Sequence, residues 1–157
     1  EVSDTSMNLL YNHSKIKSFV SLPKGEGFGR PFLEFSLTNK PIIASGWSGQ
    51  IDFLNPMYTT LLPGNLENVH ASAANQWLKA ETQWFQVSPK HFINALKSVH
   101  QKYKKFITPA KQQGHHIKTK FSFDNMKKLI GEILDKNIPE FPKQVELTLP
   151  TMETPKL

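Results

Sequence analysis

The stretch GEGFGRPFLE at residues 25–34 joins a predicted strand to a predicted helix. The run KSFVSL at residues 17–22 alternates and is rich in β-branched and aromatic side chains, which is typical of a strand. Pro31 suits the first turn of a helix, where its missing N–H costs nothing. A strand, a glycine-rich turn and a helix N-terminus direct several free N–H groups at one point, so the stretch predicts an anion site.

Two carboxylates frame this turn. Glu26 lies within it, and Glu34 lies about one turn into the helix. Gly25, Gly27 and Gly29 let the backbone approach a ligand closely, because no Cβ stands in the way. A carboxylate accepts two hydrogen bonds from a vicinal diol. The pair of carboxylates beside an anion site therefore predicts a sugar that carries a phosphate.

The segments after the turn indicate a parallel sheet. The apolar run PIIAS at residues 41–45 predicts a buried strand, and YTTLLPG at residues 58–64 predicts another that ends in Pro-Gly. Strand, helix and strand form a βαβ unit, so the turn at residues 46–52 should lie beside the turn at residues 25–34. We expect an α/β fold, with a parallel sheet of four to six strands, helices on both faces and a ligand at the carboxyl ends of the strands.

The segment EGFGRPFLE, with its E-x7-E spacing, and the following KPIIASGWSGQIDFL resemble the C-terminal half of family 4 glycosyltransferases of the GT-B fold. The resemblance implies a Rossmann-like domain that binds a nucleotide sugar. It implies that Glu26 is the catalytic residue that contacts the donor sugar, and that Glu34 holds the ribose hydroxyls. The other candidate donor-binding residues are Lys24, Gly27, Phe28, Gly29, Arg30, Ser48 and Gly49.

One position departs from the family's pattern. Ser48 stands where the family usually has the first of two glycines, whereas Gly49 and Asp52 match the second glycine and the acid after it. A serine hydroxyl can still donate to a phosphate. The amides of the turn, with Lys24 or Arg30, would stabilise the negative charge of a departing nucleoside diphosphate.

The resemblance implies transfer of a sugar from a nucleotide diphosphate donor, with retention of configuration. Full enzymes of the family have a second α/β domain upstream, so we expect a fragment that lacks the acceptor domain and is inactive alone. No D-x-D motif occurs among the four aspartates. We therefore expect no metal and no other cofactor, and the acceptor stays unknown.

Three alternatives remain. Arg30 and Glu34 are four residues apart and would also suit an ordinary surface ion pair. A second alternative is a non-catalytic binding or scaffold module that has kept the fold. A third possibility is polyanion binding through lysine-rich helices. A dinucleotide-binding G-x-G-x-x-G fits less well, because it needs glycine where Arg30 stands.

Composition sets further bounds. The 157 residues suit one domain, which we place at residues 1–137 with an insertion at residues 65–86, followed by an extended, proline-containing tail at residues 138–157. The absence of cysteine agrees with a reducing, cytoplasmic location. The net charge is +6, but 18 of the 19 basic residues are lysine. Nucleic-acid surfaces usually employ arginine, so we expect no specific nucleic-acid binding and at most a weak attraction to membrane surfaces.

The C-terminal part is expected to be helical. Ser88-Pro89 should open one helix, Thr108-Pro109 a second that continues to about Thr119, and Ser122 a third with an amphipathic stripe. His115 and His116 point about 100° apart on a helix, which makes them a poor pair of metal ligands.

Overall fold

A computed structural model describes residues 2–139 and contains the predicted parallel sheet. Its strands are β1 (Phe19–Ser21), β2 (Ile42–Ser45) and β3 (Thr60–Leu62), in the order β1-β2-β3. Both pairings are parallel, with Phe19 opposite Ile42 and Ile43 opposite Thr60. The expectation of four to six strands is wrong for the described residues, because residues 64–87 form a separate hairpin and residues 89–137 are mainly helical.

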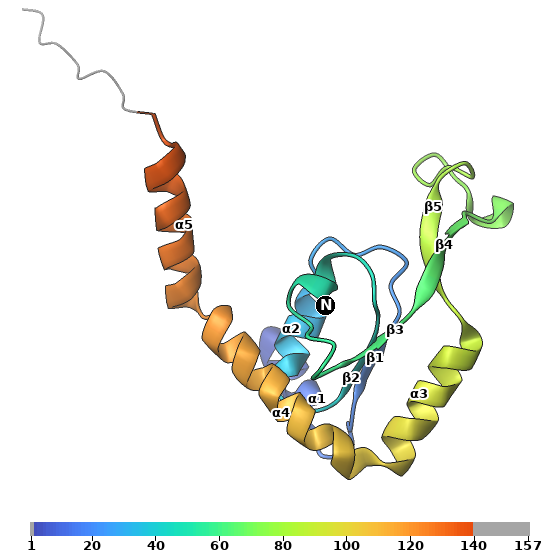
Figure 1. The fold of residues 1–157 in the computed structure, drawn as a ribbon, viewed down its shortest axis with the longest axis horizontal. Helices are drawn as coiled ribbons and strands as arrows, with labels where there is room; N and C mark the ends of the chain where they lie inside the picture. Colours follow the sequence, from blue (N-terminus) through green and yellow to red (C-terminus); the bar gives the residue numbers. More distant parts are fainter. Residues whose placement is uncertain (1, 140–157) are drawn as a thin grey trace, which may run out of the picture.

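Helices cover both faces of the sheet, as predicted (Figure 1). One face carries α1 (Asp4–Asn12), α2 (Arg30–Ser36) and the later turns of α4 (Tyr103–Lys120), and the other carries α3 (Pro89–Gln101) and the first turn of α4. The alternation of a strand explains this arrangement, since successive side chains of β2 point to opposite faces.

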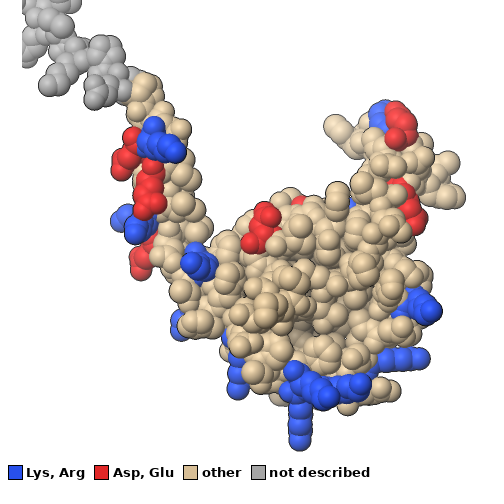
Figure 2. Space-filling view, viewed as in Figure 1, with Lys and Arg blue, Asp and Glu red and all other residues tan. Residues whose placement is uncertain are grey.

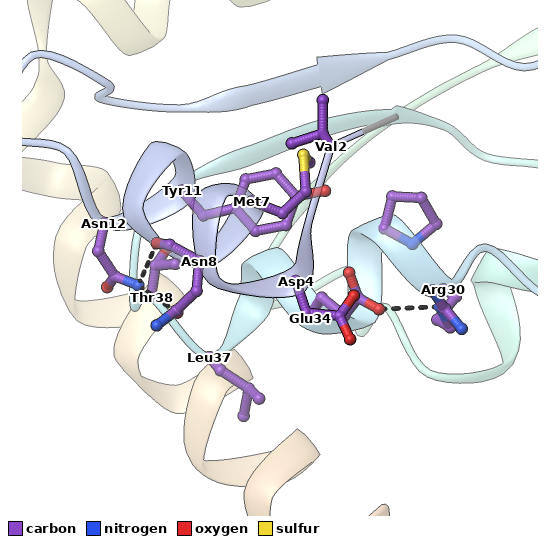
Figure 3. Close-up of a pocket in the computed structure, with 11 residues that line it drawn as sticks. Val2, Asp4, Met7, Asn8, Tyr11, Asn12, Arg30, Glu34, Leu37 and Thr38 are labelled. Carbon is purple, nitrogen blue, oxygen red and sulfur yellow. Dashed lines mark hydrogen bonds and ion pairs between the residues drawn. The ribbon is translucent and has the colours of Figure 1, made fainter.

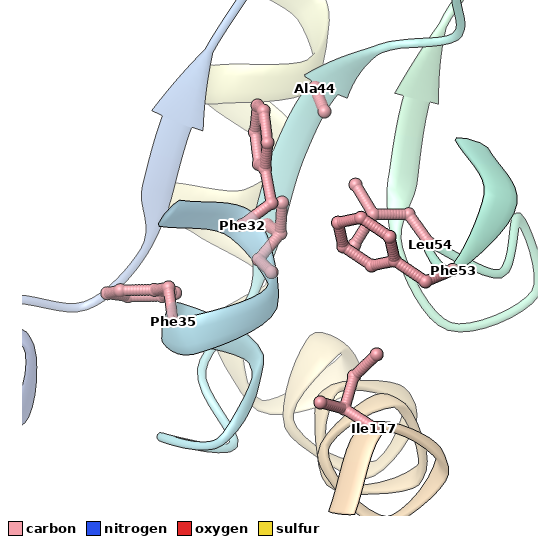
Figure 4. Packing of buried hydrophobic residues seen from close by; sticks show 7 residues of the cluster. Phe32, Phe35, Ala44, Phe53, Leu54 and Ile117 are labelled. Atoms are coloured by element: carbon pink, nitrogen blue, oxygen red, sulfur yellow. The ribbon is translucent and has the colours of Figure 1, made fainter. Parts of the chain in front are cut away.

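Two apolar clusters result. Ile42 and Ala44 of β2 pack with Phe32 and Phe35 of α2 on the first face (Figure 4). The same cluster includes Phe53, Leu54 and Ile117. Ile43 points to the second face, where it packs with Ala95 and Val99 of α3 and with residues of β3 and β5. The fully buried β2 is therefore the centre of the fold.

Residues 65–86 fold mostly as an antiparallel hairpin. Its strands are β4 (Gly64–Asn68) and β5 (Gln83–Val87), with Gly64 opposite Val87, and the short helix η2 (Ala71–Ala73) lies between them. Phe85 and Val87 are buried in the second cluster, so β5 is anchored to the domain. Figure 1 shows the hairpin at the end of the sheet where the parallel strands terminate.

The helical C-terminal part differs from the prediction at one boundary. Thr108-Pro109 does not open a helix, because α3 ends at Gln101 and α4 runs through Pro109. Ala110, Gln113, Gly114 and Ile117 of α4 are buried, and this packing outweighs the hydrogen bond that proline removes.

The last helix, α5 (Phe123–Asn137), begins as predicted with Ser122 as N-cap. It projects from the rest of the molecule and has no buried residue (Figure 1). Of the predicted tail, residues 140–157 lie outside the described part of the chain.

Candidate functional site

The strand, turn and helix predicted around residues 25–34 are present. The turn leaves β1 at Ser21 and enters α2 at Arg30, with Pro31 in the first helical turn. Gly29 caps α2 in the left-handed conformation, with φ of 92°, and it is buried against Gln50 and Phe32. A side chain at this position would be strained, so this glycine is required by the backbone.

The turn after β2 lies directly against the glycine turn, as the βαβ reading predicts. The hydroxyl of Ser48 donates to the carbonyl of Glu26 at 2.6 Å and accepts from the Glu26 amide at 2.9 Å. The Gly49 amide donates to the same carbonyl at 3.1 Å. Ser48 and Gly49 therefore hold the two turns together, and the polar groups assigned to phosphate binding already have partners within the chain.

Other donors of the glycine turn remain free. Among the described residues, no acceptor receives a hydrogen bond from the amides of Gly27, Phe28, Gly29 or Arg30. The Phe28 side chain packs on Phe53 with ring centroids 5.0 Å apart, and this contact anchors the turn to the apolar core. Four consecutive amides are thus held in place and unpaired, which suits an anion.

Gln50 packs against Gly29 and carries a buried acceptor. Gln50, at 0% exposure, belongs to the short helix η1 (Gly49–Asp52) and donates from Nε2 to the Ser45 carbonyl at 3.0 Å. Its Oε1 is buried and has no hydrogen-bond partner among the described residues. A buried acceptor without a donor is uncommon and costs free energy, so a ligand or water that donates a hydrogen bond to Gln50 Oε1 would be stabilising.

Glu34 borders a cavity of about 620 Å³ between α1 and α2 (Figure 3). Its carboxylate pairs with Arg30 at 2.9 Å, and the two side chains are 41% and 78% exposed. The alternative of a surface ion pair is therefore what the structure contains. Glu26 is not among the residues that border this cavity.

The cavity has a polar rim and an aromatic wall. Asp4, Glu34 and Arg30 lie at one end, and Tyr11 closes the base (Figure 3). Burial raises the pKa of Tyr11 above its ordinary value, and the Glu34 carboxylate adds to the increase while Arg30 opposes it. Lys40 donates to the Tyr11 carbonyl at 2.6 Å, which fixes the end of α1 over the cavity.

Lys24 contacts the hairpin. Its Nζ donates to Gln86 Oε1 at 2.6 Å and lies 3.6 Å from the centre of the Trp84 ring. Trp47, just before Ser48, stacks on Phe85 with the rings 5.5 Å apart and almost parallel. Sequence reasoning missed this cluster, although the tryptophan beside the second turn was a visible signal. The hairpin therefore forms one wall beside the two turns.

The basic side chains gather elsewhere. Lysines surround the connection between α3 and α4, at the end of the molecule away from the hairpin (Figure 2). Residues 82–123 contain eight lysines and no aspartate or glutamate. The lysine-rich surface and the glycine turn are thus separate features.

No cluster of three or more histidine, cysteine or acidic side chains has the arrangement of a metal site within residues 2–139. No described helix combines the length and the apolar composition that a membrane crossing requires. Comparison of the chain with protein-family models and with curated proteins gave no match.

Proposed function

We propose that the chain is the donor-binding part of a GT-B-type glycosyltransferase that uses a nucleotide diphosphate sugar. One observation carries the proposal. The glycine turn after β1 is hydrogen-bonded to the turn after β2 at the carboxyl end of a parallel sheet, and it keeps the amides of residues 27–30 unpaired. Ligands of open α/β sheets bind at this edge.

In this proposal the diphosphate accepts hydrogen bonds from the free amides of Gly27 to Arg30. Preorganised N–H groups stabilise charge that develops as the nucleoside diphosphate leaves, and they need no reorganisation during the reaction. Arg30 at the start of α2 adds a cation. Lys24 is engaged by Trp84 and Gln86 of the hairpin, so it must leave these partners to contact the diphosphate. Glu26 orients the sugar ring, which is a positioning role.

Glu34 binds the ribose hydroxyls in this proposal, and its ion pair with Arg30 must yield to them. Such a pair is worth only about 0–1 kcal/mol when both partners are exposed. With exposures of 78% and 41%, the pair is weak enough for a diol to compete for the carboxylate. The cavity beside Glu34 supplies space for the nucleoside.

Calorimetric titration of the chain with UDP, GDP and ADP sugars tests this function. We expect weak binding of one donor, at least a tenfold loss of affinity in Glu34→Ala, and no sugar transfer by the isolated chain. Glu132→Ala is the matched control, because Glu132 also forms an exposed i,i+4 pair, with Lys128 on α5. Equal donor affinities of the wild type and Glu34→Ala, or turnover by the isolated chain, would contradict the proposal.

The alternative functions give different titrations. A scaffold module that only keeps the fold would bind none of the donors. A polyanion-binding protein is favoured by the stretch of residues 82–123 that has eight lysines and no carboxylate. Its affinity for heparin would fall steeply with salt and would be the same in Glu26→Ala, Glu34→Ala and the wild type.

A further inference from the structure

Trp47 presents an open aromatic surface beside the glycine turn. It lies two residues after β2 and is 39% exposed, whereas Phe85 of β5 is 7% exposed. The two rings are almost parallel, with 5.5 Å between their centroids, so Phe85 covers one face of the indole. Among the described residues, Phe85 is the one aromatic ring that contacts Trp47. The exposed part of the indole is therefore available to a ligand.

A closed set of contacts fixes this indole beside Glu26. The Phe85 amide donates to the carbonyl of Lys24 at 3.0 Å, just before the glycine turn. Two residues later, the Glu26 carbonyl accepts from the Ser48 hydroxyl at 2.6 Å. Ser48 directly follows Trp47, whose ring stacks on Phe85. These contacts start and end at Phe85, so they place Trp47 and Glu26 in one small group of residues.

Phe85 is a firm support for the indole. A Cβ on Gly64, at the start of β4, would overlap the Gln86 carbonyl and lie 2.8 Å from the Phe85 ring. The ring also belongs to the second apolar cluster, with Ile43 and Val99. Because the support is buried and closely packed, the indole is held in place before a ligand arrives, and binding to its open face requires little reorganisation.

Glu26 supplies a polar group next to this surface. Its side chain is half-buried, and its Cγ lies 3.4 Å from the position that a Cβ would take on Gly29, so it bends over the turn. Within residues 2–139, its carboxylate forms no ion pair and accepts no hydrogen bond. A free carboxylate accepts hydrogen bonds from neighbouring hydroxyls, and an open indole face packs on C–H groups. A sugar ring offers both, with hydroxyls at its edge and C–H groups on its faces.

The order of groups along the glycine turn matches the order of groups in a nucleotide sugar. In the proposed function the nucleoside occupies the cavity between α1 and α2, which Arg30 borders and Glu26 and Trp47 do not. The unpaired amides run from Arg30 back to Gly27, which is next to Glu26. A diphosphate on these amides leads from the cavity toward Glu26, so the sugar beyond it reaches the carboxylate and the indole.

We propose that Trp47 binds the sugar of the nucleotide donor. A pyranose ring stacks on the indole face opposite Phe85, and its hydroxyls donate to the Glu26 carboxylate. The inference rests on the proposed transferase function and deepens it, because it adds a specificity-determining residue for the transferred sugar. The hairpin then has a role in the site, since Phe85 supports the indole.

Calorimetric titration of the wild type and Trp47→Ala with UDP-glucose, GDP-mannose and ADP-glucose, each compared with its nucleoside diphosphate, tests the proposal. For the nucleotide that binds, Trp47→Ala should weaken the nucleotide sugar by about fivefold or more and leave the diphosphate within about twofold, because only the sugar reaches the indole. Trp47→Phe keeps an aromatic face and should retain most of the affinity. Trp77→Ala is the matched control, because Trp77 is 86% exposed and contacts no aromatic ring among the described residues.

A measurement on the wild type avoids any effect of the substitution on folding. The chain has three tryptophans, so its NMR spectrum contains three indole N–H signals, which the Trp47→Phe and Trp77→Ala variants assign. The nucleotide sugar should shift the Trp47 signal saturably and by clearly more than its nucleoside diphosphate does. The Trp77 signal should stay in place with both ligands.

The outcomes separate this inference from the proposed function. If a nucleoside diphosphate binds but Trp47→Ala weakens it as much as the nucleotide sugar, Trp47 only supports the fold of the site. That result overturns this inference and leaves the proposed function standing, and a Trp47 signal that responds equally to both ligands has the same meaning. If neither nucleotides nor nucleotide sugars bind the wild type, the proposed function and this inference are both overturned.

Discussion

At the scale of the residue, Gly49 is the position where the two turns of the candidate site meet. A Cβ built on Gly49 would overlap the Gly27 carbonyl and would lie 2.8 Å from the Phe28 Cα. Those atoms are backbone and cannot move aside by a rotamer change. Gly27, on the other side of the contact, has open space at its own Cβ position. The contact therefore requires glycine at one of the two positions only.

Gly49→Ala should lower the free energy of unfolding by about 1–3 kcal/mol, the usual cost of forcing extra volume into a packed contact. Urea denaturation followed by circular dichroism measures the change. Gly27→Ala, which meets nothing within 4 Å, is the control and should stay within about 0.5 kcal/mol of the wild type. Similar losses in both variants would mean that the two turns do not pack as described.

At the scale of the element, the packing of α4 on α2 explains why a helix tolerates Pro109. Gly114 of α4 lies against the end of α2, where a Cβ would overlap the Asn39 side chain and lie 2.7 Å from the Ser36 carbonyl. The close approach of the helices lets Ile117 reach the first apolar cluster. Gly131 of α5 also lies within a helix, but nothing stands within 4 Å of its Cβ position.

Alanine at these two glycines should therefore have opposite effects. Gly131→Ala should stabilise the chain by up to about 0.5–1 kcal/mol, because glycine is a poor helix former. Gly114→Ala should destabilise it by about 1–3 kcal/mol, since a backbone carbonyl must shift. Thermal unfolding of the two variants measures both effects, and a stabilising Gly114→Ala would show that α4 does not pack closely on α2.

At the scale of the whole molecule, the apolar clusters are built from α1 to Phe121, and α5 lies outside them. Ile130 and Ile133 of α5 are 56% and 51% exposed, whereas Ile117 of α4 is 2% exposed. The lysines are also unevenly placed, and many gather around the connection between α3 and α4 (Figure 2). The buried apolar contacts that stabilise the chain therefore lie between α1 and Phe121, whereas α5 contributes none of them.

Ile117→Ala should cost about 2–5 kcal/mol of unfolding free energy, the range for emptying a buried aliphatic position. Ile130→Ala and Ile133→Ala should each change it by less than about 0.5 kcal/mol, because these side chains contact solvent. Chemical denaturation of the three variants gives the comparison. A loss in the α5 variants that approaches the Ile117 value would place α5 against the core.

Local signals predicted much of the architecture, including the part that carries the candidate site. The alternation at residues 17–22, the glycines before Pro31 and the apolar run at residues 41–45 predicted β1, α2 and β2. The serine caps of α3 and α5 were also visible. These signals act within a few residues of the chain, so the amino-acid sequence by itself determined these elements.

The contacts between distant parts of the chain could not be predicted from local signals and follow from the folded structure. Ser48 bonds with Glu26 across 22 residues, and Gln113 fixes residues 53–55 from nearly 60 residues away. Glu34 borders the cavity between α1 and α2 whereas Glu26 does not, and the backbone of Glu26 is instead hydrogen-bonded to the second turn. The continuation of α4 through Pro109 and the hairpin between β3 and α3 likewise depend on buried contacts. The spacing of residues along the chain determines which side chains are adjacent within one helix or strand. The contacts between different helices and strands depend on how the whole core packs.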